Sequence, residues 1–167
     1  MKNLPLLFSI LLLSCSAPTP GPGVKASSLK AEEERVMESL HDEPLRNGTK
    51  EVHTENGITT EVWTQKEEHG SPHKIVETLI LKNGKLISHT ITDSAEKFAF
   101  SRQYKDGKVI QLSEVRGDRY STWFLKNEKP EGRTLIQGKE SECVVYENAL
   151  PVVKAMSVCE SRFNTAP

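Results

Sequence analysis

Two histidines, His69 and His73, lie close together in the chain, directly after a pair of glutamates. Imidazole nitrogens and carboxylate oxygens are ligands for zinc, so this segment is a candidate metal site. However, Gly70 and Pro72 oppose the helical i, i+4 geometry that would bring both rings to one ion. The pattern therefore favours a solvated loop over a metal centre, and we expect no cofactor.

The sequence lacks the G-x-S-x-G and H-E-x-x-H motifs and the Gly-rich phosphate loop. Acidic residues are plentiful, but no spacing among them selects a general acid and a general base. Composition counts against another class, because 22 Lys and Arg against 23 Asp and Glu offer no basic field to gather nucleic acid. We therefore expect a non-catalytic protein with no nucleic-acid partner.

The first fourteen residues carry one cation, Lys2, followed by an apolar run that ends in Leu12-Leu13-Ser14-Cys15. The run is shorter than the roughly 20 apolar residues of a spanning helix and is typical of a secretory signal. Residues 12–15 resemble the lipobox of bacterial lipoproteins. That resemblance implies cleavage before Cys15, acylation of its thiol, and anchoring of the mature chain at a membrane by two or three acyl chains.

The same resemblance implies a location in the cell envelope. Ser16 follows the cysteine where an Asp would imply retention at the inner membrane. By this analogy the outer membrane is favoured over the inner membrane. The alternative is an ordinary cleaved signal followed by an incidental cysteine.

The chain has three cysteines, and an odd number in an exported protein leaves one that needs a separate fate. If Cys15 is acylated, Cys143 and Cys159 form the only possible pair in an oxidising compartment. A loop centred near 150–152 would set the two opposite each other on antiparallel strands, at a Cα separation that a disulfide accepts. We predict a structural disulfide between them.

The chain divides into a signal (1–14), a lipidated cysteine with a Pro/Gly/Ser-rich tether (15–27), one domain (28–160) and a flexible tail (161–167). Ser28 is the expected N-cap of a helix over residues 29–41. One face of that helix is apolar and should pack on a sheet: Leu29, Val36, Met37 and Leu40. The opposite face is charged and is expected in solvent: Lys30, Glu32, Glu33, Glu34 and Glu38.

Tight-turn dipeptides punctuate the chain at Asn56-Gly57, Asn83-Gly84, Asp106-Gly107 and Gly117-Asp118. They predict a mainly β (α+β) fold: an antiparallel meander of about nine or ten strands, forming a curved sheet or half-barrel under the helix. We expect three-residue turns ending at Gly57 and at Gly107, and a two-residue turn at 117–118. We also expect a longer loop over 127–133 and final strands over 142–147 and 152–160. The register between 75–81 and 86–92 is left open.

These turns align one buried apolar face over the central strands. Its predicted members are Phe98, Phe100, Ile110, Leu112, Trp123 and Leu125.

Three classes of function fit these features. The first is a membrane-anchored envelope lipoprotein whose domain binds another envelope component without catalysis. The second is a carrier of a lipid or other apolar ligand, because one helix followed by many antiparallel strands resembles the lipoprotein-carrier half-barrels in element order. The third is a small envelope inhibitor or sensor. The expected partners are the membrane, through Cys15, and an unknown envelope protein or apolar ligand.

Overall fold

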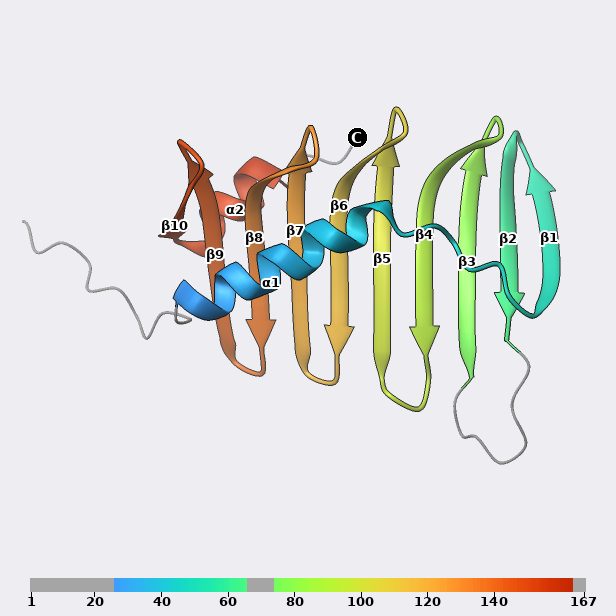
Figure 1. Ribbon diagram of the computed structural model, residues 1–167, viewed down its shortest axis with the longest axis horizontal. Helices are drawn as coiled ribbons and strands as arrows, with labels where there is room; N and C mark the ends of the chain where they lie inside the picture. Colours follow the sequence, from blue (N-terminus) through green and yellow to red (C-terminus); the bar gives the residue numbers. More distant parts are fainter. Residues whose placement is uncertain (1–25, 66–73, 164–167) are drawn as a thin grey trace, which may run out of the picture.

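The structure, a computed structural model, describes residues 26–65 and 74–163. In Figure 1 these residues form one open antiparallel sheet of ten strands, and α1 crosses one of its faces obliquely. The elements in chain order are α1 (Ala26–Glu38), the 3-10 turn η1 (Ser39–His41), β1 (Thr49–Glu55), β2 (Ile58–Thr64), β3 (Ile75–Lys82), β4 (Lys85–Asp93), β5 (Phe98–Lys105), β6 (Lys108–Arg116), β7 (Arg119–Lys126), β8 (Lys129–Gln137), β9 (Glu140–Glu147), β10 (Leu150–Lys154) and α2 (Met156–Phe163).

The predicted mainly β meander with an N-terminal helix packed on it is confirmed, because the spatial order of the strands is their order in the chain. The predicted three-residue turns are wrong. Glu55 pairs with Ile58, and Lys105 pairs with Lys108, so two residues connect each of these hairpins. Both central residues of each turn have positive φ, which matches the right-handed twist of the flanking strands.

The predicted loop over 127–133 is also wrong. Lys126 pairs with Lys129 across a turn made of Asn127 and Glu128, both with positive φ. This turn contains no glycine, so the dipeptide signal that marks the others is missing.

Three β-bulges recur near one end of the sheet, between β3 and β4, β5 and β6, and β7 and β8. A bulge inserts one extra residue and turns two consecutive side chains to the same side. In β6 the pairs Tyr104 with Val109 and Gln103 with Gln111 leave Ile110 as the extra residue.

This bulge corrects the predicted apolar face. Leu112, Trp123 and Leu125 are buried under α1, and Phe100 packs half-buried beside them. The predicted burial of Ile110 was wrong, because this side chain is 40% exposed. Val109, which is 4% exposed, occupies the core position instead. Phe98 is only half-buried, with the Arg116 guanidinium 4.9 Å above its ring.

The apolar stripe of α1 is confirmed, because Val36 and Leu40 are buried on the sheet and Leu29 and Met37 pack beside them. The helix begins earlier than predicted, at Ala26, so Ser28 lies inside it and is not its N-cap. The predicted solvent face was wrong in part: Glu32 accepts hydrogen bonds from strand residues, and so does Glu33.

The last predicted strand is also wrong. The chain leaves β10 at Lys154 and forms α2, which extends into the predicted tail. Cys143 and Cys159 lie at disulfide distance, with Cα atoms 6.0 Å apart, but the bond joins β9 to a helix and not two strands. The Phe163 ring stacks on Phe124 at 4.4 Å. Side chains alternate along a strand, so α2 lies on the face opposite α1, which we term the outer face.

Candidate binding surfaces

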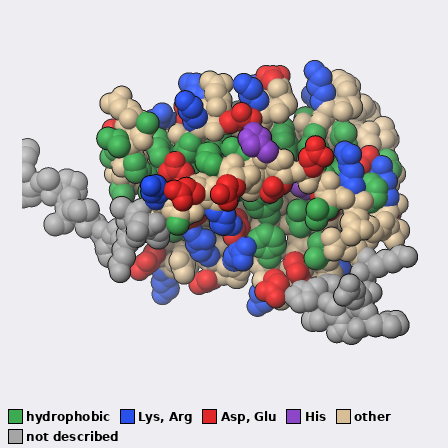
Figure 2. All heavy atoms as spheres, viewed as in Figure 1, with side chains coloured by type: hydrophobic (Ala, Val, Ile, Leu, Met, Phe, Trp, Pro, Cys, Tyr) green, Lys and Arg blue, Asp and Glu red, His purple; other side chains and the backbone are tan. Residues whose placement is uncertain are grey.

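The charged side chains of the central sheet gather on the α1 side, where α1 covers them. Figure 2 shows acidic and basic side chains over the middle of this face. The largest group centres on Glu32, whose carboxylate accepts hydrogen bonds from Arg119 at 2.8 Å and from Arg133 at 2.7 Å. Ser121 and Trp123 donate to its other oxygen at 3.1 and 3.3 Å. We refer to these five residues as the Glu32 cluster.

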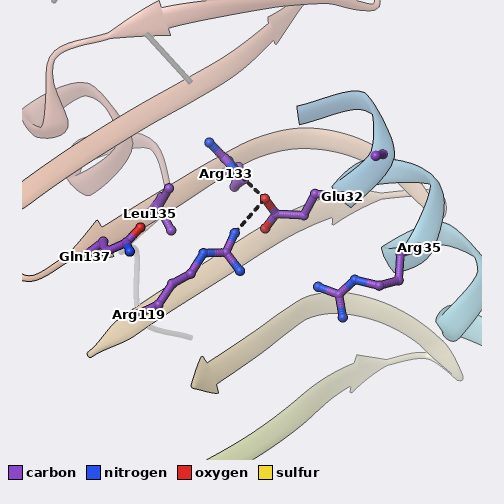
Figure 3. Close-up of a pocket in the computed structure, with 7 residues that line it drawn as sticks. Glu32, Arg35, Arg119, Arg133, Leu135 and Gln137 are labelled. Carbon is purple, nitrogen blue, oxygen red and sulfur yellow. Dashed lines mark hydrogen bonds and ion pairs between the residues drawn. The ribbon is translucent and has the colours of Figure 1, made fainter. Parts of the chain in front are cut away.

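A pocket of about 490 Å³ lies beside this cluster, between α1 and strands β7 and β8. In Figure 3, Arg119 and Arg133 point from the sheet toward Glu32, and Arg35 projects from α1. Arg133 is fully buried and also pairs with Glu142. The guanidinium of Arg133 that lines the pocket is therefore already paired with two carboxylates, those of Glu32 and Glu142. The Glu32 cluster thus holds α1 on the sheet.

A second carboxylate, Glu114, accepts a hydrogen bond from Arg35 of α1 at 2.7 Å and another from Arg116. Burial raises the pKa of Glu114, but the hydrogen bonds from the two arginines outweigh it and leave the pKa below its usual value. Glu114 is therefore ionised at neutral pH and forms a second attachment point for the helix.

A third group fixes the segment that leaves η1. Glu77 accepts the backbone N–H groups of Leu45 and Arg46 at 3.0 and 2.6 Å. His89 Nε2 lies 2.7 Å from Glu77, and Arg102 approaches His89 Nδ1 at 3.0 Å. Because arginine can only donate, Nδ1 accepts and Nε2–H donates, so the imidazole is neutral. Arg102 also donates to the main-chain oxygen of Ser39 at 2.6 Å.

The outer face has the opposite character. Between the strand ends, strands β3 to β7 place no charged side chain on it. One row of hydroxyl side chains runs straight across the sheet: Thr78, Thr90, Ser101, Ser113, Thr122 and Thr134. The parallel row toward the turns at 93–98 and 116–119 is mostly apolar: Val76, Thr92, Ala99, Val115, Tyr120 and Ile136.

Among the described residues, the outer face is covered by a helix only at the side where α2 lies. α2 contacts β8 and β9, and no other described helix lies on this face. Tyr120, Ile136 and Ile110 remain 39 to 41% exposed on it. The edges of the sheet are less suited to contacts, because β1 carries the charged residues Lys50, Glu51 and Glu55 and Pro151 lies within β10.

Several predicted site residues lie outside the described residues: Cys15, His69 and His73. In the described part of the chain, no three His, Cys, Asp or Glu side chains are grouped as a metal ion would need. Neither described helix is long and apolar enough to cross a membrane.

The burial of several charged and polar side chains was not predicted from the sequence. Glu77, His89, Arg102 and Arg133 all occupy inward positions of strands, where alternation would place them once the register is known. Their charge made them look like solvated surface residues.

Comparisons of this chain with family models, with curated proteins and with solved structures found no match.

Proposed function

We propose that this chain is a membrane-anchored lipoprotein of the bacterial envelope whose β domain is a non-catalytic binding domain. The anchor is Cys15, in the lipobox-like segment 12–15. The binding surface is the uncharged outer face over β3 to β7. Its exposure carries the proposal, since a sheet face without charges loses little polar solvation when a partner covers it.

The partner that fits this face is another envelope protein with an uncharged surface of hydroxyl, amide and aliphatic side chains. The centres of protein interfaces are depleted in charge, as this face is, and it also carries the exposed aromatic residue Tyr120. A charged partner would leave its ions unpaired here.

The geometry favours this function over the carrier of an apolar ligand. A carrier needs apolar side chains that line an open cavity. Here the apolar side chains of the helix side, among them Leu112 and Trp123, are packed against Val36 and Leu40 of α1. The pocket beside α1 is lined largely by arginine and glutamate.

The anchor is tested by Cys15→Ser in the native host. Membranes are washed in 1 M salt, which removes proteins held by charge alone. The unaltered protein should stay in the membrane fraction and Cys15→Ser should move to the soluble fraction. Retention of Cys15→Ser after this wash would contradict the lipid anchor.

The outer face is tested with a photo-crosslinking residue at Ser101, at the centre of the hydroxyl row. The matched control is Thr54, which lies on the α1 side of β1. We expect one protein adduct from position 101 and none from position 54. Thr90→Lys should abolish the adduct by placing a charge in the face, whereas Thr54→Lys should leave it intact. An adduct that survives Thr90→Lys, or that contains only a second copy or a glycan, would contradict the proposed partner.

A further inference from the structure

Three hairpins carry directly opposed lysine pairs. Lys82 pairs with Lys85, Lys105 with Lys108, and Lys126 with Lys129. Like charges directly opposite each other in an antiparallel pair are destabilising. The same unfavourable arrangement therefore recurs three times, each time around a tight two-residue turn.

All six lysines lie along one edge of the sheet. The hairpins β3–β4, β5–β6 and β7–β8 turn at the upper edge in Figure 1. By alternation the lysines all lie on the outer-face side. Neighbouring hairpins are two strand spacings apart, about 10 Å, and the row from β3 to β8 is about 24 Å long. We term these six residues the lysine rim.

The lysine rim has an excess of positive charge. All six lysines are exposed. Three acids lie in the same hairpin ends, at Asp106, Glu128 and Glu131. Of these six lysines, only Lys126 has an acid of the described residues within ion-pair distance: Glu131 at 3.8 Å. The hairpins are spaced by about one Debye length at 0.1 M salt, so their fields overlap at lower salt and are screened from one another at higher salt.

We propose that the lysine rim binds the anionic headgroups of a phospholipid surface. Clusters of four to eight cations bind such surfaces through the summed attraction of each ammonium group for the lipid phosphates. Hairpin tips arranged in a line meet a plane along their whole length. A phosphate placed between the two lysines of a hairpin would also remove their mutual repulsion.

This inference rests on the proposed anchor, which keeps the rim near a membrane. Ala26 lies eleven positions after Cys15, and a fully extended chain spans about 3.5 Å per residue. The tether therefore reaches at most about 39 Å, which raises the effective concentration of headgroups around the rim. With the rim on the lipid, the plane of the sheet stands upright and the outer face remains open to a neighbouring envelope protein.

The test uses the full chain carrying Cys15→Ser, so that no acyl chain contributes to binding. Flotation is measured with vesicles of phosphatidylglycerol and phosphatidylethanolamine, and with vesicles of phosphatidylcholine alone. The rim variant replaces six lysines by glutamine: K82Q, K85Q, K105Q, K108Q, K126Q and K129Q. A matched control removes the same charge elsewhere: K30Q, K50Q, K74Q, K97Q, K139Q and K154Q.

We expect the parent chain to bind the anionic vesicles at 0.05 M salt and to lose at least tenfold in partition at 0.5 M salt. The rim variant should bind at least tenfold less than the parent, and the control variant should stay within threefold. Equal losses in the two variants, or binding unchanged in the rim variant, would overturn the inference. Thermal melts of both variants check that each is folded.

A second arm separates the lipid surface from free phosphate. Inorganic phosphate at 10 mM should not displace the chain from the vesicles, because one ion does not span the row. Displacement at that concentration would assign the lysines to a soluble anion instead. The salt-washed fractionation of Cys15→Ser tests the anchor independently, so the anchor can stand while the rim inference fails.

Discussion

Glu32 of α1 and Arg133 of β8 are joined by a 2.7 Å ion pair under the helix, although 101 residues separate them in the chain. Arg133 has no exposed surface, and Glu142 is its second acidic partner. A residue expected on the solvent side of the helix is thus a main contact between α1 and the sheet.

Removing this contact should loosen the helix. Glu32→Gln leaves Arg119 and Arg133 short of a negative partner under α1, and breaking a buried pair from one side costs about 3 kcal/mol. We expect the free energy of unfolding, measured in urea, to fall by about that amount. Glu34→Gln is the control, because Glu34 is 66% exposed and, within the described part of the chain, forms an ion pair only with Lys30 at 3.8 Å. Similar losses in the two variants would contradict the role of Glu32.

The bulge in β6 makes a prediction about two neighbouring residues. Val109→Thr places a hydroxyl in the core and should lower the free energy of unfolding by about 1 to 2 kcal/mol. Ile110→Thr changes a side chain on the outer face and should alter it by no more than about 0.5 kcal/mol. Urea denaturation of the two variants distinguishes this register from the reverse, in which Ile110 would be the sensitive position.

Acid should weaken the group around His89. Burial lowers the pKa of His89, the hydrogen bond to Glu77 partly opposes this, and the charge of Arg102 lowers it further. In the unfolded chain the pKa of a histidine is about 6.5. Between this value and the lowered pKa of the folded state, the unfolded chain therefore binds more protons than the folded chain. The contribution of His89 to the free energy of unfolding should be fully present above about pH 6.5. It should be lost as the pH falls from there through the lowered pKa of the folded state.

This pH dependence is measured by urea denaturation between pH 7.5 and pH 5. His89→Gln should remove most of the slope in that range. His53→Gln should preserve it, because the His53 side chain is 79% exposed. The pKa values of Glu61 and Glu114 are lowered, so the stability that their ionised carboxylates contribute to the fold is lost only at a pH below this range. A slope that persists in His89→Gln would contradict this assignment.

The Cys143–Cys159 bond should contribute through the loop it closes. A closed loop of about 15 residues corresponds to about 3 kcal/mol in the chain-entropy model. Replacing both cysteines by alanine should lower the free energy of unfolding by about that amount and release α2 from β9. Thiol counting on the denatured native protein should find neither cysteine free, and two free thiols there would contradict the bond.

The sequence was sufficient for the meander, because hairpin turns with glycine and strand alternation are local signals. It was insufficient where a local signal is absent or overridden. Asn127–Glu128 turns the chain without glycine, and the bulge at Ile110 reverses a side chain with no change in composition. The Cys143–Cys159 pairing was accessible, but its route through α2 was not, because setting the two cysteines opposite each other on paired strands required the last strand to continue past Lys154.

The buried charges were missed for a different reason. Glu77 and Arg133 are stabilised by partners 12 and 101 residues away, and such long-range pairing leaves no periodic trace in the chain. The lysine pairs left a trace in the K-x-x-K spacing around three turns, but their common edge depends on the register of the sheet.

The recurrence of turn, lysine pair and bulge gives the sheet a modular construction. Each strand pairs only with its neighbours in the chain, and β1 and β2 lie beyond the reach of α1 in Figure 1. A hairpin duplicated near that end would widen the sheet by two strands without altering the attachment of either helix. The width of this protein is therefore a property that evolution or an engineer can adjust one hairpin at a time.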